Sequence, residues 1–368
     1  MGAVVAETPC ITDLPALVSA LSRDDREVFR RLFDVRVVYG ELRPPEAMHP
    51  WLMHQFGSVA SVFRQKIVRV TNTVTGDGAL FNELRARRPL NAREQLGLKA
   101  QILDGLRHDA LASPFSETPE DVFGRIRGKH CITASNIAKY DGLHAIVIFD
   151  DPDPLRFDEE RLSDYLDTAW RWGQAAHDYD PLATYFLFVW NCLWRAGASL
   201  IHGHAQVLLT RYYHYSRIEL LRRAALGYGN GSMGSYFEDV FRVHKALGLG
   251  WERDGVRVQA CLCPIKEKEV MVMGPALDEA FVRTMYRALS CLRDRLGVTN
   301  FNVSLVTPPL GPTEETWEGF PVVARAVDRG DPQSKSSDIG GMELYANPVV
   351  AADPFVVAHE LVPFLEAA

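Results

Sequence analysis

Apolar residues recur every three or four positions in some stretches of the chain and alternate with polar residues in others. Residues 13–33 follow the helical spacing, and the Arg-Pro-Pro run at 43–45 interrupts it. Residues 66–81 alternate on both sides of a Thr-Gly-Asp-Gly turn at 75–78, which is typical of a β-hairpin. We therefore predict a helical N-terminal extension over residues 1–65, followed by sheet.

From residue 129 the chain repeats one order of elements, namely strand, strand, helix, strand, strand. In the first copy the predicted helix covers residues 158–177, and in the second copy its apolar face runs from Leu277 to Leu292. Such repetition indicates two structural units built on one plan. We predict an α+β fold of two similar halves, each a largely antiparallel sheet with packed helices.

The predicted halves cover residues 66–215 and 256–368, and residues 216–255 link them. Four glycines between positions 227 and 234 indicate a mobile segment in this linker. The halves are not equivalent, because the histidine pair in the last strand of the first half has no counterpart in residues 320–327. Only the first half is expected to carry histidine chemistry.

Composition and charge exclude several classes of function. Forty Lys and Arg against 47 Asp and Glu give a formal charge of −7, without a dense basic run, which argues against a sequence-independent nucleic-acid or membrane-surface binder. No stretch reaches the roughly 18 apolar residues of a membrane-spanning helix, and residues 1–10 do not resemble a signal peptide. The six scattered cysteines do not form a secreted disulfide pattern, so we expect a cytoplasmic protein with reduced thiols.

The segment 197–208 carries the strongest chemical signal. On a strand, residues two apart share a face, so the side chains of His202, His204 and Gln206 are expected to project together. A His-x-His pair taken alone also fits a zinc site or a hydrogen-bonded pair in the core. Gly197 and Ser199 suit a tight turn whose N–H groups and hydroxyl approach a phosphate.

These positions resemble the Gly-x-Ser-x-x-His-x-His-x-Gln signature of the galactose-1-phosphate uridylyltransferase branch of the histidine-triad superfamily. The signature falls on Gly197, Ser199, His202, His204 and Gln206. Other stretches are similar to the family's N-terminal hairpin, its nucleotide-binding Arg-x-x-Arg-Pro loop, its asparagine near the phosphates and its C-terminal Tyr-x-Asn-Pro-Val. They lie at 73–76, 85–89, Asn191 and 345–349. The resemblance runs from about residue 66 to 350 and implies two histidine-triad-like halves.

The resemblance implies a nucleotidyltransferase with a covalent intermediate. His204 would attack the α-phosphorus of a nucleotide sugar or nucleoside triphosphate and hold the nucleoside monophosphate, which a sugar 1-phosphate would then accept. Arg85, Arg88 and Ser199 would bind the non-bridging phosphate oxygens, with Asn191 near the phosphates. His202 would support His204. We expect no nucleic-acid or membrane partner and leave a homodimer open.

Gln206 bears on the identity of the acceptor. Hydrolases of the superfamily carry a third histidine there, whereas an amide donates a hydrogen bond without shuttling a proton, which favours transfer over hydrolysis. A phosphorylase that splits nucleotide sugars or dinucleoside polyphosphates with inorganic phosphate differs only in its acceptor and stays open. A nucleotide-binding module without turnover is the third hypothesis. His144, where relatives often have histidine, is left open between a structural role and a substrate contact.

Metal ligands expected from the resemblance are missing from this sequence. Many relatives bind structural zinc through Cys-x-x-Cys, a downstream histidine and the first histidine of the pair. Here Ser113 and Ser116 replace the two thiolates, and residues 150–154 contain no histidine. Neutral hydroxyls are poor zinc ligands. The second half also lacks the histidine pair that uridylyltransferases use in their C-terminal metal site. We therefore predict no metal and no other cofactor.

Overall fold

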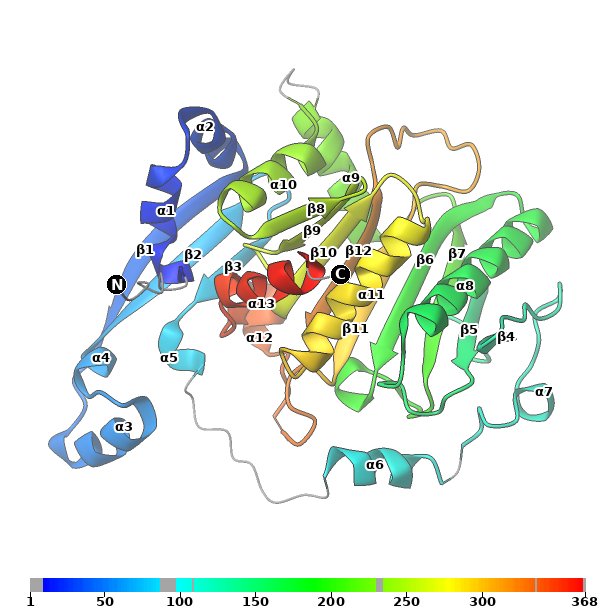
Figure 1. The fold of residues 1–368 in the computed structure, drawn as a ribbon, viewed down its shortest axis with the longest axis horizontal. Helices are drawn as coiled ribbons and strands as arrows, with labels where there is room; N and C mark the ends of the chain where they lie inside the picture. The colour runs from blue at the N-terminus through cyan, green and yellow to red at the C-terminus, as the bar shows by residue number, and fades with distance from the viewer. Residues whose placement is uncertain (1–8, 87–96, 108, 230–233, 335, 367–368) are drawn as a thin grey trace.

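The computed structural model describes residues 9–86, 97–107, 109–229, 234–334 and 336–366 (Figure 1). The N-terminal part contains short helices and the strands of a small sheet. These elements are η1 (Ile11–Asp13), α1 (Leu14–Ala20), α2 (Arg23–Leu32), β1 (Phe33–Glu41), η2 (Glu46–Met48), α3 (His49–Phe56), α4 (Ala60–Phe63), β2 (Arg64–Asn72), β3 (Gly78–Phe81) and α5 (Glu83–Ala86). Helices α6 (Leu98–Gly105) and α7 (Pro114–Glu117) follow.

The remaining chain builds a large sheet, its covering helices and a C-terminal return to the small sheet. Its elements are β4 (Cys131–Ser135), β5 (Leu143–Phe149), α8 (Glu159–Tyr179), β6 (Ala183–Cys192), η3 (Trp194–Ala196), β7 (His204–Arg211), α9 (Ser216–Gly229), α10 (Tyr236–Ala246), β8 (Gly250–Arg253), β9 (Val256–Ala260), β10 (Glu267–Gly274), α11 (Glu279–Asp294), β11 (Phe301–Val306), β12 (Val322–Asp328), α12 (Gly341–Tyr345), β13 (Val349–Val350) and α13 (Pro354–Glu366).

The nine strands of the large sheet follow the order β4-β5-β7-β6-β11-β12-β10-β9-β8, and neighbouring strands are antiparallel. The two predicted copies of strand, strand, helix, strand, strand are therefore present, and they meet where β6 pairs with β11. At that junction Asn191 lies opposite Asn302. The predicted α+β fold with two halves is confirmed, while the residues at which each half begins and ends stay a prediction.

Helices α8 and α11 cover one face of this sheet and contact each other (Figure 1). Both helices begin in the same way, because the side chain of an N-cap aspartate accepts a hydrogen bond from the third residue of the helix. Asp158 accepts from the N–H of Arg161 at 2.8 Å, and Asp278 accepts from the N–H of Phe281 at 2.9 Å. The repetition thus extends to the capping residues. No described helix has both the length and the apolar character needed to cross a bilayer.

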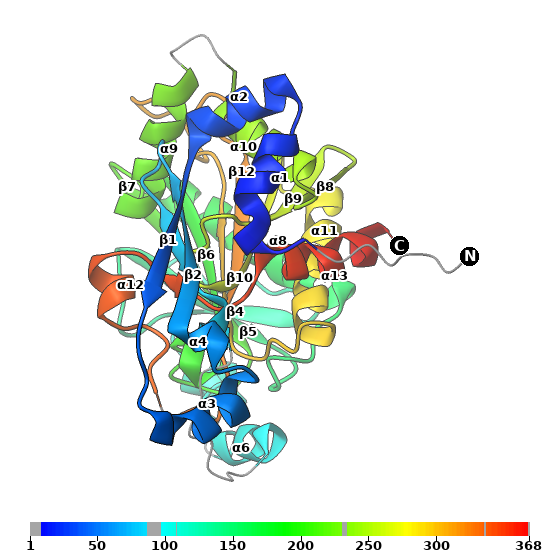
Figure 2. The same ribbon diagram turned by 90° about the vertical axis from the view of Figure 1, so that its left-hand side faces the viewer.

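The small sheet has the order β1-β2-β3-β13 and stands beside the large one, with β1 and β2 at the front of Figure 2. Strand β1 departs from the helical extension predicted over residues 1–65. It pairs with β2 along its full length, from Phe33 opposite Asn72 to Glu41 opposite Arg64. Its valines favour a strand, and the partner that stabilises it lies outside the stretch in which helical spacing was evident.

The predicted linker over residues 216–255 is mostly regular structure. Helix α10 buries Phe237, Val240 and Phe241, and it contacts α2 as well as β9. This spacing of apolar residues is that of an amphipathic helix. The sequence-based prediction of a linker rested on the glycines before this helix and missed that spacing. One continuous cluster of buried side chains runs from Ile11 to Leu365 and includes residues of both halves.

Candidate active site

His204 begins β7 on the face of the sheet opposite α8, and His202 lies two residues before the strand. Ala205 and Val207 point into the core under α8, whereas His204 and Gln206 point to the other face. In register with them on β5 are Ile148 and Ile146. His204 and Gln206 therefore share a face as predicted, whereas His202 lies before the strand begins.

His204 is the first residue of β7 and is 8% exposed. Its Nδ1 lies 2.7 Å from the carbonyl oxygen of His202. Because a carbonyl oxygen only accepts, Nδ1 carries the hydrogen and Nε2 keeps its lone pair. None of the described residues forms a hydrogen bond with that Nε2. The ring is thus held in the tautomer that a nucleophilic imidazole needs.

Burial is the largest influence on the protonation of His204. It lowers the pKa of the imidazole from 6.5, and the hydrogen bond to the His202 carbonyl opposes this shift without cancelling it. A lowered pKa keeps the ring neutral at pH 7. A neutral ring with a free Nε2 can attack an electrophilic phosphorus.

Both ring nitrogens of His202 are bound to acceptors. Nδ1 lies 2.6 Å from Oδ2 of Asp109, and Nε2 lies 2.8 Å from the carbonyl oxygen of Phe149. Each nitrogen must carry a hydrogen to make its bond. Asp109 was not among the predicted site residues, and nothing in the sequence around it indicates that it meets a histidine 93 positions later.

Gly203, between the two histidines, fits a narrow space in the backbone. Its N–H donates to the carbonyl of Pro152 at 3.0 Å, and its own carbonyl accepts from the N–H of Phe149 at 2.9 Å. A Cβ atom at this position would lie 2.7 Å from Cδ2 of Phe149 and 3.0 Å from the carbonyl oxygen of Asp151. Glycine is therefore required here by close packing, which the signature alone does not specify.

Gln206 is oriented by His144. The N–H of Tyr140 donates to Nδ1 of His144 at 3.0 Å, which places the ring hydrogen on Nε2, and Nε2 lies 2.9 Å from Oε1 of Gln206. Burial also lowers the pKa of His144, so the ring is neutral. Because the amide oxygen of Gln206 is engaged, its NH₂ group is left to donate to a ligand. His144 thus contacts a predicted site residue.

Asn191 lies near the end of β6 and is held from the second half of the sheet. Nδ2 of Asn302 donates to Oδ1 of Asn191 at 2.7 Å and to the carbonyl of Ala196 at 2.8 Å. Nη1 of Arg329 donates in turn to Oδ1 of Asn302 at 2.6 Å. Asn302 and Arg329 were missed by sequence reasoning, because only the pairing of β6 with β11 brings them to this site.

The predicted turn before the histidines is present. Gly197 ends η3 with φ of 93°, in the left-handed region that favours glycine. The N–H of Ala198 closes the turn on the carbonyl of Leu193 at 3.2 Å. Ser199 is exposed, and among the described residues its hydroxyl has no hydrogen-bond partner. Its side chain is therefore accessible to a ligand.

The two predicted phosphate-binding arginines, Arg85 and Arg88, are not placed beside the histidine pair by any described contact. Arg85 lies in α5, which packs on β2 of the small sheet, and its side chain is exposed. No described contact joins Arg85 to the histidine pair, so the structure does not bring these predicted residues together. Arg88 lies outside the described residues.

A cavity of about 590 Å³ borders the site through Asn302. Its wall brings together two stretches that carried the resemblance, the turn after β2 and the Tyr-x-Asn-Pro-Val segment. The N–H of Leu80 donates to the carbonyl of Pro348 at 2.9 Å, and β3 pairs with β13. At Gly78 a Cβ atom would lie 2.6 Å from Nδ2 of Asn347, so the two segments are in close contact.

The residues present do not fit the zinc site of relatives. Ser113 and Ser116 are exposed, and the hydroxyl of Ser116 donates to the carbonyl of Ser113 at 3.3 Å. Both nitrogens of His202 are engaged by protein acceptors and have no lone pair for a metal. Within the described parts of the chain, no three His, Cys, Asp or Glu side chains are grouped to hold a metal ion. Metal independence stays a prediction.

Solved structures share this fold. An ADP-glucose phosphorylase from Arabidopsis thaliana, with bound ADP-glucose, matches with a TM-score of 0.59 and 16% identity, over 78% of this chain and 95% of that one. A uridylyltransferase matches with a TM-score of 0.56 and 15% identity, over 81% and 98%. A GalT-like protein from Arabidopsis thaliana matches with a TM-score of 0.53 and 16% identity, over 69% and 97%.

No protein-family model and no curated protein sequence matches the chain. At these identities the similarity is one of architecture, and it extends over nearly the whole length of each matched structure. The predicted resemblance is thus confirmed at the level of the fold: the chain has the two-half, histidine-triad-like architecture of galactose-1-phosphate uridylyltransferase-like proteins.

Proposed function

We propose that the protein is a nucleotidyltransferase. It moves a nucleoside monophosphate, through a covalent intermediate on His204, between a nucleotide sugar or nucleoside triphosphate and a sugar 1-phosphate. The observation that carries this proposal is the contact of 2.7 Å between Nδ1 of His204 and the carbonyl oxygen of His202, which leaves Nε2 as the free nucleophile.

In the first step Nε2 of His204 forms a bond to the α-phosphorus, and the bond from that phosphorus to the bridging oxygen breaks. The leaving group takes the electron pair, and it is a sugar 1-phosphate or pyrophosphate according to the donor. The ring gains positive charge as the new bond forms, and the hydrogen bond from Nδ1 to the His202 carbonyl stabilises that charge. In the second step a phosphate oxygen of the acceptor attacks the phosphorus and releases a neutral imidazole.

Hydrogen-bond donors around His204 would bind the non-bridging oxygens of the α-phosphate. The amide groups of Gln206 and Asn191 are suited to this role, since each has its oxygen engaged and its NH₂ group without a partner among the described residues. The exposed hydroxyl of Ser199 is a third donor. We assign Arg85 and Arg88 to phosphate binding as well, on the sequence resemblance.

The same arrangement favours a phosphate acceptor over water. Water must lose a proton to attack, whereas a phosphate oxygen is already anionic at pH 7. Gln206 cannot take that proton, and the hydrogen on Nε2 of His144 is directed to Gln206. Transfer to a sugar 1-phosphate and phosphorolysis by inorganic phosphate are therefore both supported. The similarity to an ADP-glucose phosphorylase favours phosphorolysis as the second candidate function.

Intact-protein mass spectrometry tests this proposal. We expect incubation with one of a panel of nucleotide sugars and nucleoside triphosphates to add the mass of one nucleoside monophosphate, and His204→Ala to prevent it. The isolated adduct is then mixed with inorganic phosphate or with a sugar 1-phosphate. The acceptor that restores the unmodified mass distinguishes the two candidates. Absence of an adduct with every donor would contradict transfer and support a binding module.

The proposed setting is the cytoplasm. All six cysteines are free in the structure, and burial raises the pKa of the thiols of Cys131, Cys192 and Cys261. Unpaired, unreactive thiols support a reducing compartment. A homodimer stays a prediction.

A further inference from the structure

We propose that Asp109 is a positioning residue for this reaction. By binding the ring of His202, it holds the backbone carbonyl that fixes the orientation of His204. This inference rests on the proposed function, because it assigns a role in presenting the nucleophile. Asp109 does not touch the reacting atoms, so it acts only through His202.

The contact between Asp109 and His202 is short and withdrawn from water. Oδ2 of Asp109 lies 2.6 Å from Nδ1 of His202, and the two side chains are 12% and 6% exposed. A hydrogen bond to an ionised carboxylate is stronger than one between neutral groups, and more so away from solvent. Because Nε2 of the same ring is bound to the carbonyl of Phe149, the ring is fixed at both ends.

A fixed ring constrains the backbone of its own residue. The peptide that follows is also held, because Gly203 exchanges hydrogen bonds with Phe149 and Pro152. The carbonyl oxygen of His202 therefore has little freedom, and it is the atom that receives Nδ1–H of His204. The Asp109 carboxylate thus contacts the ring of His202, and the carbonyl of His202 contacts the nucleophile His204.

Asp109 follows helix α6 in the chain, and the packing of this helix positions Asp109 beside His202. Ile102 of this helix is 5% exposed and belongs to the main core, which anchors the helix. Gly105 packs directly on the chain just before the histidines, since a Cβ atom there would lie 2.4 Å from Cγ1 of Ile201. Gly105 and Asp109 therefore hold residues 201 and 202 in place, Gly105 by packing and Asp109 by its hydrogen bond.

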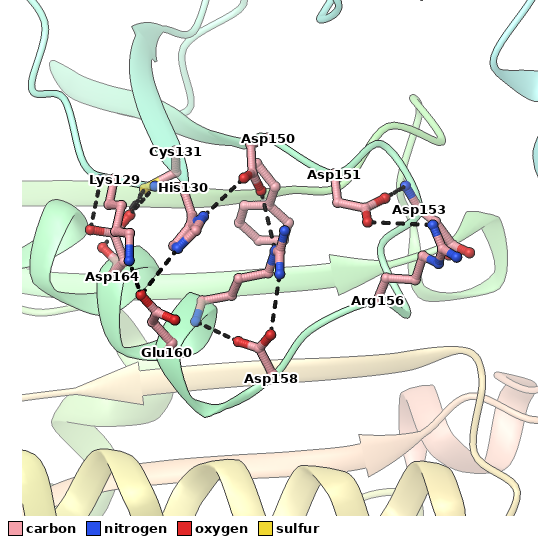
Figure 3. A network of polar contacts seen from close by, with 12 residues as sticks. Lys129, His130, Cys131, Asp150, Asp151, Asp153, Arg156, Asp158, Glu160 and Asp164 are labelled. Carbon is pink, nitrogen blue, oxygen red and sulfur yellow. Dashed lines mark hydrogen bonds and ion pairs between the residues drawn. The ribbon is translucent and has the colours of Figure 1, made fainter.

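A second Asp–His pair in the same half provides a matched control. Oδ2 of Asp150 lies 2.9 Å from Nδ1 of His130, and a dashed line joins the two side chains in Figure 3. Asp150 is 40% exposed and is shared with Arg161 at 3.4 Å, and the other nitrogen of His130 faces Glu160. This pair belongs to a solvated network of charges. It makes the same kind of bond as Asp109 with His202 but has no contact with His204.

The kinetic test measures the rate of adduct formation on His204 at saturating donor, together with the KM for the donor. We expect Asp109→Ala to lower the rate about 100-fold and Asp109→Asn about tenfold, with KM unchanged in both. Asparagine retains an acceptor oxygen for Nδ1–H but lacks the charge, so its loss is smaller. Asp150→Asn should stay within about twofold of the parent protein. Equal rates for Asp109→Asn, Asp109→Ala and the parent would overturn the proposal.

A spectroscopic test does not require the protein to be enzymatically active. It therefore tests the positioning role of Asp109 separately from the proposed nucleotidyltransferase function. In protein labelled with ¹⁵N-histidine, we expect N–H resonances from both ring nitrogens of His202 and from Nδ1 of His204. Asp109→Asn should shift those of both residues, and Asp150→Asn should shift neither. If His202 changes while Nδ1–H of His204 does not, Asp109 has no positioning role. If the parent protein forms no adduct with any donor, the proposed function fails while this measurement still decides the role of Asp109.

Discussion

The two halves of the large sheet place polar side chains in the same row but satisfy them in different ways. Gln206 on β7 and Arg325 on β12 lie in one register row across the sheet, with Val189 and Ser304 between them. Each is bound by a side chain of the next strand outward. For Gln206 the partner is the neutral His144, and for Arg325 it is the carboxylate of Glu269.

The difference lies in what is left unbound. Nε of Arg325 donates to Oε1 of Glu269 at 2.6 Å, and Oε2 of Glu269 accepts from the N–H of Ile265 at 2.7 Å, so both oxygens of this carboxylate are bound. In the first half the described residues leave the NH₂ group of Gln206 without a partner. The same position of the fold therefore holds an ion pair with a fully bound carboxylate in one half and an amide with an unused donor in the other.

The largest expected effect is on the chemistry of the first half. His204→Ala should lower nucleotidyl transfer by roughly 10⁴-fold or more, because no other described group occupies the position of the nucleophile. The acid-labile mass adduct should disappear with it. Retention of an adduct in this variant would mean that another residue is the nucleophile. It would contradict the assignment of the chemistry to His204 in the first half.

Next in size is an effect on the stability of the second half. Arg325→Met leaves the Glu269 carboxylate, which is fully buried, without its counter-charge, so we expect the free energy of unfolding to fall by about 3–5 kcal/mol. Adding Glu269→Leu should recover most of that loss. His144→Phe removes only neutral hydrogen bonds, those with Gln206 and Tyr140, and should cost about 1–3 kcal/mol. Urea unfolding monitored by circular dichroism measures all three, and a larger loss for His144→Phe would refute the comparison.

A smaller effect tests whether the second half supports the first. Asn302→Ala removes the donor to Asn191 and Ala196, so we expect nucleotidyl transfer to slow about tenfold, the size of one lost hydrogen bond to a positioned group. Ser304→Ala, two residues along the same face of β11, is the matched control and should change the rate less than twofold. Equal rates in the two variants would mean that Asn191 needs no support from across the junction.

The smallest effect concerns pH. Attack requires a neutral ring, and burial lowers the pKa of His204 below 6.5, so protonation begins only in more acidic solution than for an ordinary histidine. The rate of adduct formation should therefore be nearly constant from about pH 8 to 6.5 and should fall below that range. Single-turnover rates across the range measure this. A midpoint above pH 6.5 would contradict a buried, neutral nucleophile.

Much of the fold and part of the site could be read from local patterns. The spacing of apolar residues gave the repeated order of elements, and the period of two along a strand placed His204 and Gln206 on one face. The positive φ of Gly197 also follows from a local rule, since a tight turn needs a residue without Cβ. These features depend on residues close together in the chain, and covalent geometry fixes their relation.

Contacts between distant residues were decided only by the tertiary structure. Strand β1 depends on its pairing with β2, and Asn302 reaches Asn191 only because β6 and β11 meet at the junction of the halves. Asp109 meets His202 because α6 packs against the chain before β7. The sequence alone determined which groups are available for chemistry. Sheet register and helix packing decided which of them are bound and which stay free, because each such contact depends on the placement of whole elements rather than on spacing along the chain.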